Sequence, residues 1–313
     1  MAHSIENVFE TIAEQIQAKG VEVILYYLTG NLMKDILAIR KTMADIFHIT
    51  GDIHWIALFL PGKRTAMTIH DIGFYTNHKH TPKLIIKRYL YCDLPVYHLH
   101  KITAVSRETK SQLLKIIGIK PDKIEIIENP VTQKVEFSPK TFNKSKPVIL
   151  QIGTGQHKNL IGLVEAVRGI NCRIEIVGNP SNELLVKMDE YGIEYNIETN
   201  IGNERICEKY RECDIVYFAS TVEGFGLIIL EGQSIGRPVI TSNISPMAEI
   251  AADGALLVNP ASVKEIRSGI IRLIDDSEYR ETLIEKGLVN VKRFQPAEIS
   301  KKYIEFYFNN FKL

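Results

Sequence analysis

The sequence predicts an α/β protein built from two doubly wound, Rossmann-type domains. Three observations carry this prediction. Short apolar runs rich in β-branched residues alternate with amphipathic helical segments, which is typical of parallel sheets covered by helices. The 313 residues are enough for two domains of ordinary size. The segment 132–146 is polar and lacks hydrophobic periodicity, which predicts a linker between them.

These features set the expected domain limits. We expect an N-terminal domain over residues 1–140 and a C-terminal domain over residues 141–295. The final segment, 296–313, reads as a helix because it opens with Pro296, a residue favoured in the first helical turn. We expect this helix to pack back on the N-terminal domain.

In the first half, a helix comes before any strand. The segment 4–18 has a helical pattern, and five apolar runs after it predict strands. These runs are 21–28, 45–50, 65–71, 101–106 and 123–129. A doubly wound domain normally begins with a strand and a glycine-rich turn, so we expect this domain to lack its first strand.

The second half predicts a parallel sheet more clearly. Its strands are continuously apolar, which is typical of strands buried on both faces. They are expected at 147–153, 172–178, 214–220, 238–243 and 255–260. Ligands of such sheets bind at the carboxyl ends of the strands.

Composition narrows the class of protein. The chain is 45% hydrophobic and 24% charged, as in globular proteins, and no apolar run approaches the ~18 residues of a membrane span. The segment "MAHSIENVFE" does not have the basic-then-apolar pattern of a signal peptide, and the four cysteines form no CxxC pair. We therefore expect a cytoplasmic location, and the inner face of a membrane is the further expectation. A net charge of +1 and the lack of a recognition motif argue against nucleic acid as a partner.

The turn after the strand 214–220 has the features of an anion site. Gly224 and Gly226 allow the backbone to come close to a ligand. The N–H groups of Phe225, Gly226 and Leu227 open the following helix, and such groups bind anions, for example a diphosphate.

Two carboxylates flank this turn. Glu223 lies on it, and Glu231 lies just over one turn into the helix among apolar residues. A carboxylate accepts two hydrogen bonds side by side, which suits the vicinal hydroxyls of a sugar. The pattern therefore indicates a nucleotide sugar. The alternative is that both glutamates only interact favourably with the helix macrodipole, worth ~0.3–1 kcal/mol each.

The spacing of Glu223 and Glu231 resembles the E-x7-E signature of the retaining glycosyltransferases of family 4, which have the two-domain GT-B fold with a cleft between the domains. Further segments resemble the motifs of that family in the family's order. They are "TIHD" at 68–71, "TAVSRETKSQLL" at 103–114, "IIENPV" at 126–131 and "IGTGQHKNLIGLVEAV" at 152–167.

The resemblance implies roles on the donor side. Lys158 would hold the donor diphosphate, Glu223 would contact hydroxyls of the transferred sugar, and Glu231 would bind the ribose diol. The base would lie near Gly178 and the loop at Ile201. The implied donor-binding residues are Gly153, Lys158, Gly178, Ile201, Glu223, Gly224, Phe225, Gly226, Leu227 and Glu231.

The resemblance also implies catalytic roles for Glu223, Lys158 and His70, with His70 facing the sugar across the cleft. Each has an ordinary structural alternative. A lysine after a glycine-rich turn is often plain surface, and His70 could equally be a hydrogen-bonded core histidine.

The acceptor is expected on the first domain. The residues in question are His70, Asp71, Lys83, Lys87 and Arg88. The segment 78–101 is basic and aromatic, and a cationic amphipathic helix there would suit an anionic membrane or a lipid pyrophosphate. The alternative is a surface helix that packs its apolar residues on the sheet.

The predicted function is transfer of a sugar from a UDP- or GDP-sugar to a glycan or lipid-linked acceptor in polysaccharide biosynthesis, with retention of anomeric configuration. No cofactor is expected, and no Asp-x-Asp motif suggests a metal site. Two other functions fit the same pattern: a non-catalytic or truncated nucleotide-sugar-binding protein, and a GT-B-like nucleotide-sugar epimerase.

Overall fold

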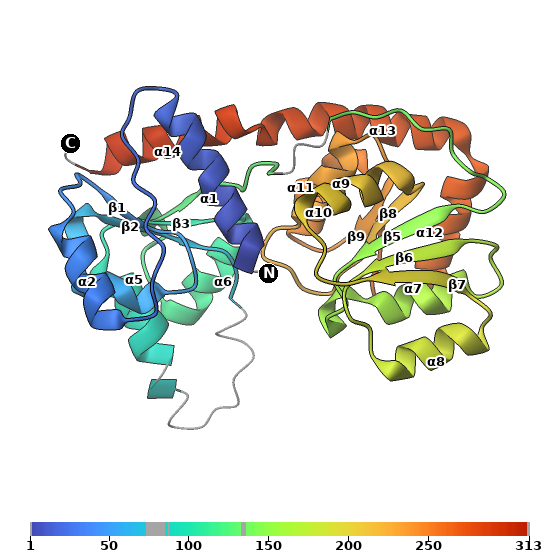
Figure 1. Cartoon of the computed structure of the whole chain (residues 1–313), viewed down its shortest axis with the longest axis horizontal. Coiled ribbons are helices and arrows are strands. Elements are labelled where there is room, and N and C mark those ends of the chain that lie inside the picture. Colours follow the sequence, from blue (N-terminus) through green and yellow to red (C-terminus); the bar gives the residue numbers. More distant parts are fainter. Residues whose placement is uncertain (1, 73–84, 87, 133–135, 312–313) are drawn as a thin grey trace. The chain divides into compact units, whose positions relative to one another are not determined.

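The computed structural model describes residues 2–72, 85–86, 88–132 and 136–311 (Figure 1). The chain forms two units, each with its own parallel sheet. The first unit comprises Met1–Thr132 together with Gln295–Leu313, and the second comprises Gln133–Phe294. The last helix thus belongs to the first unit.

In the part of the first unit that the structure describes, the sheet has four parallel strands in the order β1-β2-β3-β4. They are β1 (Phe47–Ile49), β2 (Thr65–Ile69), β3 (Ile102–Ala104) and β4 (Ile124–Ile126). Among the described residues of this unit, the α-helices are α1 (Ala2–Gln17), α2 (Leu32–Lys41), α5 (Leu94–His98), α6 (Arg107–Ile117) and α14 (Pro296–Asn310). A π-helix, Tyr89–Asp93, leads into α5.

The prediction of a strand at 21–28 is wrong. The segment carries no strand in the structure, and Ile24 and Tyr27 are more than half exposed. The β-branched and aromatic residues favour an extended chain, but a strand needs a neighbouring strand to complete its hydrogen bonds. Side chains hold the segment instead: Gln17 Nε2 donates to the carbonyl oxygen of Val23 over 2.9 Å.

α1 and α14 pack against each other beside this sheet (Figure 1). Both ring nitrogens of His48, on β1, are engaged: Nδ1 lies 2.6 Å from the Tyr307 hydroxyl of α14, and Nε2 lies 2.8 Å from Thr68 Oγ1 of β2. Burial lowers the pKa of His48 to about 3. The C-terminal helix is therefore fastened to the sheet around a neutral, partly buried imidazole.

The second unit, described from residue 136 onward, has six parallel strands in the order β10-β9-β8-β5-β6-β7. They are β5 (Val148–Ile152), β6 (Arg173–Val177), β7 (Glu194–Glu198), β8 (Ile215–Phe218), β9 (Val239–Ser242) and β10 (Leu256–Val258). Counted from β5, this is the 3-2-1-4-5-6 order of dinucleotide-binding folds. The order reverses between β5 and β8, and such folds bind ligands at this switch point, outside the carboxyl ends of the strands.

Helices cover both faces of this sheet. They are α7 (Leu160–Val167), α8 (Asn182–Glu190), α9 (Asn203–Glu212), α10 (Leu227–Ser234), α11 (Met247–Ala251), α12 (Val263–Asp275) and α13 (Ser277–Val291). Apolar residues of α7 and α12 form one core with the strands, and Figure 1 shows α9, α10 and α11 on the other face. The helices after β5 and β8 thus leave the sheet on opposite sides, as at a switch point.

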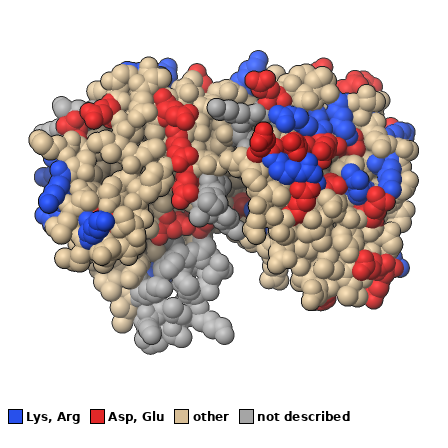
Figure 2. Space-filling model, viewed as in Figure 1, with Lys and Arg blue, Asp and Glu red and all other residues tan. Residues whose placement is uncertain are grey.

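The second unit contains ion pairs, and one of its paired lysines is buried. On the face drawn in Figure 2, acidic and basic side chains are intermixed over it. Lys209, on α9, is buried between the carboxylates of Glu175 and Glu198. All four cysteines of the chain are buried, and none of them forms a disulfide: Cys92, Cys172, Cys207 and Cys213. In the described ranges, no helix combines the length and hydrophobicity that crossing a bilayer requires.

Candidate functional site

Lys158 and Glu223 meet at the switch point of the second sheet. Lys158 ends a short 3-10 helix after β5, and Glu223 lies in the loop after β8. Lys158 Nζ lies 2.6 Å from Glu223 Oε1, and each side chain is 13% exposed. A cation and an anion are thus held together at the place where the fold binds ligands.

Glycines let the loops around this pair approach closely. Gly153, just after β5, has φ +87°, and a Cβ there would lie 3.2 Å from Cγ of Lys158. Gly178, just after β6, has φ +142°, and a Cβ there would lie 2.8 Å from Cγ2 of Thr154. Both glycines were predicted at the donor site, and both are needed for the observed loop packing.

The amino end of α10 has the geometry expected of an anion site. Gly226, the N-cap, has φ +114°, a conformation that residues with a side chain rarely adopt. Phe225 is buried and packs edge-on against Phe294, with ring centroids 6.0 Å apart. The buried ring fixes the turn, and the first two amides of the helix, those of Leu227 and Ile228, have no acceptor within the helix itself. The amide of Ile229 already donates to the carbonyl oxygen of Gly226 over 3.0 Å.

Glu231 is buried in α10 and is held by a residue that sequence reasoning missed. Its Oε2 accepts a hydrogen bond from the hydroxyl of Tyr210, on α9, over 2.5 Å. Glu231 is 7% exposed, and Tyr210 is fully buried. Burial raises the pKa of Glu231, and the bond from Tyr210 opposes this shift. Glu231 thus has a direct side-chain partner inside the second unit.

Asn159 is a second residue that sequence reasoning missed. It adopts the left-handed conformation, with φ 56°, directly before α7. Its Nδ2 donates to the carbonyl oxygens of Ala219 and Pro260, over 3.1 and 2.8 Å. Asn159 thereby ties together the loops that follow β5, β8 and β10. The signal in the sequence that could have identified Asn159 is its position directly after Lys158.

The last predicted donor residue, Ile201, is half-buried in the loop between β7 and α9. This loop and the turn at Gly178 follow neighbouring strands, because β6 pairs with β7. All the predicted donor residues therefore lie at the carboxyl ends of strands in the second unit or on α10.

In the first unit, His70 and Asp71 follow β2. His70 is 8% exposed, and its Nε2 lies 2.8 Å from the carbonyl oxygen of Thr50. Burial lowers the pKa of His70, although the bond to Thr50 opposes the shift. Since a carbonyl can only accept, Nε2 carries the proton, and Nδ1 of the neutral ring is an acceptor.

The predicted acceptor segment is described only in part. Lys83 and Lys87 lie outside the described residues. Arg88 Nε lies 3.4 Å from Asp93 Oδ2, so its charge is already partnered. Burial raises the pKa of Asp93.

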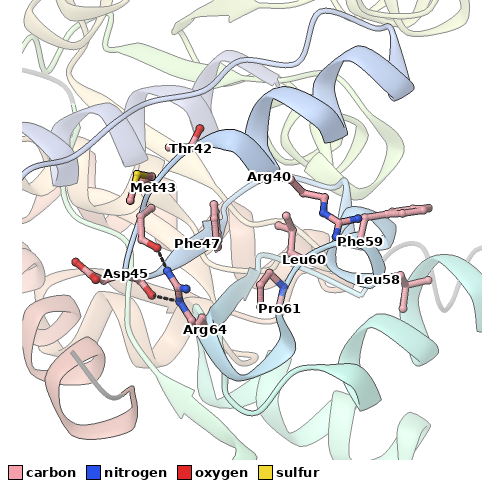
Figure 3. A pocket seen from close by; sticks show the side chains of 11 residues that line it. Arg40, Thr42, Met43, Asp45, Phe47, Leu58, Phe59, Leu60, Pro61 and Arg64 are labelled. Atoms are coloured by element: carbon pink, nitrogen blue, oxygen red, sulfur yellow. Dashed lines mark hydrogen bonds between the residues drawn. The ribbon is translucent and has the colours of Figure 1, made fainter.

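A pocket of about 770 Å³ opens elsewhere in the first unit (Figure 3). Its lining includes Arg40, Phe47, Phe59 and Arg64. Phe47 begins β1 and Arg64 directly precedes β2, so the pocket lies at the amino ends of these strands, away from His70. Its described lining includes none of the predicted site residues that the structure describes.

Within the described residues, no group of three or more His, Cys, Asp or Glu side chains is placed to hold a metal ion. Lys158 and the amino end of α10 are the positive groups of the site.

Comparisons with known proteins give the family. The family model described as "Glycosyl transferases group 1" matches residues 132–288, and the model described as "Glycosyltransferase Family 4" matches residues 25–134. Together they cover both units.

Individual relatives share about a quarter of the aligned residues with this chain, at 25% and 24% identity. The O-antigen chain mannosyltransferase B of Escherichia coli is 25% identical over 282 residues, which are 81% of this chain and 73% of that protein. D-inositol 3-phosphate glycosyltransferase of Corynebacterium glutamicum is 24% identical over 308 residues, 86% of this chain and 73% of that protein.

Solved structures share the fold. HepE from Anabaena, in complex with UDP, matches with a TM-score of 0.74 at 18% identity, over 90% of this chain and 83% of that one. This likeness, with the two parallel sheets, confirms the predicted GT-B fold. The chain belongs to the group 1 glycosyltransferases of family 4.

Proposed function

We propose that this glycosyltransferase moves a sugar from a nucleoside-diphosphate sugar to a glycan or lipid-linked acceptor, with retention of anomeric configuration. The observation that carries the proposal is the pairing of Lys158 with Glu223 at the switch point, next to the amino end of α10. A diphosphate needs such positive groups, and a sugar needs such a carboxylate. HepE, which shares the fold, holds UDP, and this supports a UDP-sugar; the likeness to a mannosyltransferase keeps a GDP-sugar as the other choice.

Each residue then has a chemical task. Lys158 and the amides from Phe225 to Leu227 bind the diphosphate and stabilise its charge as it leaves, which is the main catalytic contribution. Glu223 binds hydroxyls of the sugar, and Glu231 binds the ribose diol. The transition state at the sugar is oxocarbenium-like. The departing phosphate takes the proton of the acceptor hydroxyl, so no covalent intermediate on the protein is required.

His70 is the proposed contact to the sugar from the first unit. Its Nδ1 is an acceptor while Nε2 donates to Thr50. A neutral imidazole suits this task because it accepts a hydrogen bond from a sugar hydroxyl and carries no positive charge that would attract the diphosphate. Asp71 and Arg88 are proposed for the acceptor side, where the acceptor is a glycan or a lipid-linked sugar at the inner face of a membrane. The proposed reaction needs no metal ion.

The test is product analysis. Purified protein is incubated with UDP-glucose or GDP-mannose, with and without candidate acceptors. Transfer that needs acceptor and gives a product of the donor's own anomeric configuration by proton NMR is the expected result. A changed donor sugar without acceptor would instead identify an epimerase. Binding of donor without hydrolysis or transfer to any acceptor would identify a non-catalytic nucleotide-sugar-binding protein.

A further inference from the structure

We infer that Glu223 makes capture of the diphosphate by Lys158 depend on an attached sugar, so that the site selects the intact donor over the free nucleoside diphosphate. This inference rests on the proposed function and adds a selection between the donor and its own leaving group. It starts from the ion pair between these two residues.

The pair is well held without any ligand. Lys158 Nζ and Glu223 Oε1 are 2.6 Å apart, and both side chains are largely buried. The lysine stem lies against Gly153, and Nζ lies 4.9 Å from the centroid of the Phe218 ring. Over the described ranges, Glu223 provides the only ion pair of Lys158. The cation that should bind phosphate is thus already neutralised by a carboxylate.

A free nucleoside diphosphate meets this carboxylate as a competitor. To bind Lys158, the terminal phosphate must draw Nζ away from Glu223. The carboxylate then loses its cation while largely buried, which is strongly unfavourable unless a new partner arrives. The terminal phosphate also carries up to two negative charges at neutral pH, because its second pKa is near 6. Glu223 therefore opposes the free diphosphate twice, through competition and through repulsion.

An intact donor reduces both the competition for Lys158 and the repulsion by Glu223. The sugar esterifies the terminal phosphate and removes its second ionisation. Its hydroxyls donate hydrogen bonds to Glu223, and hydrogen bonds to a charged acceptor are among the stronger ones. Lys158 can then turn to the phosphate while Glu223 stays partnered. The exchange replaces one ion pair by two satisfied contacts.

The same exchange runs in reverse after transfer. When the bond between the anomeric carbon and the phosphate oxygen has broken and the sugar has joined the acceptor, its hydroxyls leave Glu223. The carboxylate recovers Lys158 as its partner, which weakens the hold on the nucleoside diphosphate. Glu223 would thus favour release of the product.

The test is a pair of affinities measured by calorimetry: UDP against UDP-glucose, and GDP against GDP-mannose. They are measured on the wild type and on Glu223→Gln. The variant should bind the free diphosphate about tenfold more tightly and the matching nucleotide sugar about tenfold more weakly, as expected for loss of one charge-assisted contact. Glu194→Gln is the matched control, because it removes one carboxylate from an exposed ion pair with Lys146 at the amino end of β7. It should leave all affinities unchanged.

The outcomes separate this inference from the proposed function. A Glu223→Gln variant that shifts both ligands by the same factor overturns the selection role and leaves the donor site intact. A folded wild type that binds none of the four ligands overturns both. If Glu223→Gln does not fold, Glu223→Ala must show the same change in the ratio of the two affinities, and an unchanged ratio overturns the inference.

Discussion

At the scale of single residues, Glu231 is placed where burial opposes its ionisation. Its pKa is raised, so the folded state keeps the proton to higher pH than the unfolded chain does. The contribution of Glu231 to the free energy of unfolding therefore falls as pH rises from the ordinary pKa of a glutamate through the raised value. Above that value this contribution no longer changes with pH. The ionised form is the one that can accept two hydrogen bonds from a ribose. In the role proposed for Glu231, binding of the ribose and stability of the fold make opposite demands on this carboxyl group.

Glu231→Gln should separate the two demands. The amide keeps the shape and the acceptor for the Tyr210 hydroxyl but carries no charge. We expect the variant to be as stable as the wild type near pH 4.5 and more stable at pH 7.5, because the penalty for ionisation has gone. Donor affinity should fall roughly 10- to 100-fold with the loss of charge-assisted bonds. Urea denaturation at the two pH values and calorimetry measure both; a variant less stable than wild type at pH 7.5 contradicts the account.

Tyr210→Phe tests the partner. The hydroxyl donates to Oε2 and lowers the pKa of Glu231 against the effect of burial. Removing it should raise this pKa further, so that donor affinity is lost at a higher pH than in the wild type as the solution is acidified. The measurement is the dissociation constant of the donor between pH 5 and 8. Equal midpoints for the two proteins would mean that Tyr210 only fills space.

At the scale of loops and strands, the site depends on the hydrogen bonds of Asn159, which hold together the loops that follow β5, β8 and β10. Asn159→Ala leaves the carbonyl oxygens of Ala219 and Pro260 without their donor and puts alanine in a left-handed conformation. Asn200 has nearly the same backbone conformation, with φ 54°, but is exposed. Asn200→Ala therefore carries the backbone cost alone.

We expect Asn159→Ala to be about 2 kcal/mol less stable to urea than Asn200→Ala, from two unsatisfied buried acceptors. Donor affinity should also fall, since the loops of Lys158 and Glu223 share this fastening. Equal losses of stability in the two variants would show that the hydrogen bonds of Asn159 contribute little.

The sequence correctly predicts β2, β8 and β9, which are buried at every position, because continuous apolar runs leave few other readings. It also predicts β4 and β10, each of which exposes one residue. β7 was missed because it is an edge strand with alternating polar residues, from Glu194 to Glu198. The segment 21–28 was wrongly predicted because β propensity does not supply a neighbouring strand. The pairing of Lys158 with Glu223 and of Glu231 with Tyr210 could not be predicted, because it depends on where loops and helices far apart in sequence meet.

At the scale of the whole molecule, the two units should respond differently to acid. In the first unit, burial lowers the pKa of His48 to about 3 and also lowers those of His54 and His70. The unfolded chain takes up protons on these residues near pH 6.5 while the folded unit does not. Stability of the first unit is therefore lost as pH falls below about 6.5. The shifted carboxylates of the second unit, such as Glu198, come into play only nearer their ordinary pKa.

Hydrogen exchange followed by mass spectrometry should show this order. Lowering the pH from 7 to 5, with rates corrected for intrinsic exchange, should expose amides of β1, β2 and α14 before those of β5, β6 and β8. His48→Gln should reduce the difference, because the amide can bond Tyr307 or Thr68 without a proton to gain. Equal opening of the two units at pH 5 would contradict it.

The buried thiols give each unit its own reporter. Cys92 lies in the first unit, and the other three cysteines lie in the second. Burial keeps the pKa of Cys172 at about 11 and that of Cys213 at about 12, so neither presents a reactive thiolate to reagents while its unit is folded. Alkylation of a cysteine therefore requires that its unit opens. Identifying the modified peptide by mass spectrometry shows which of the two units has opened.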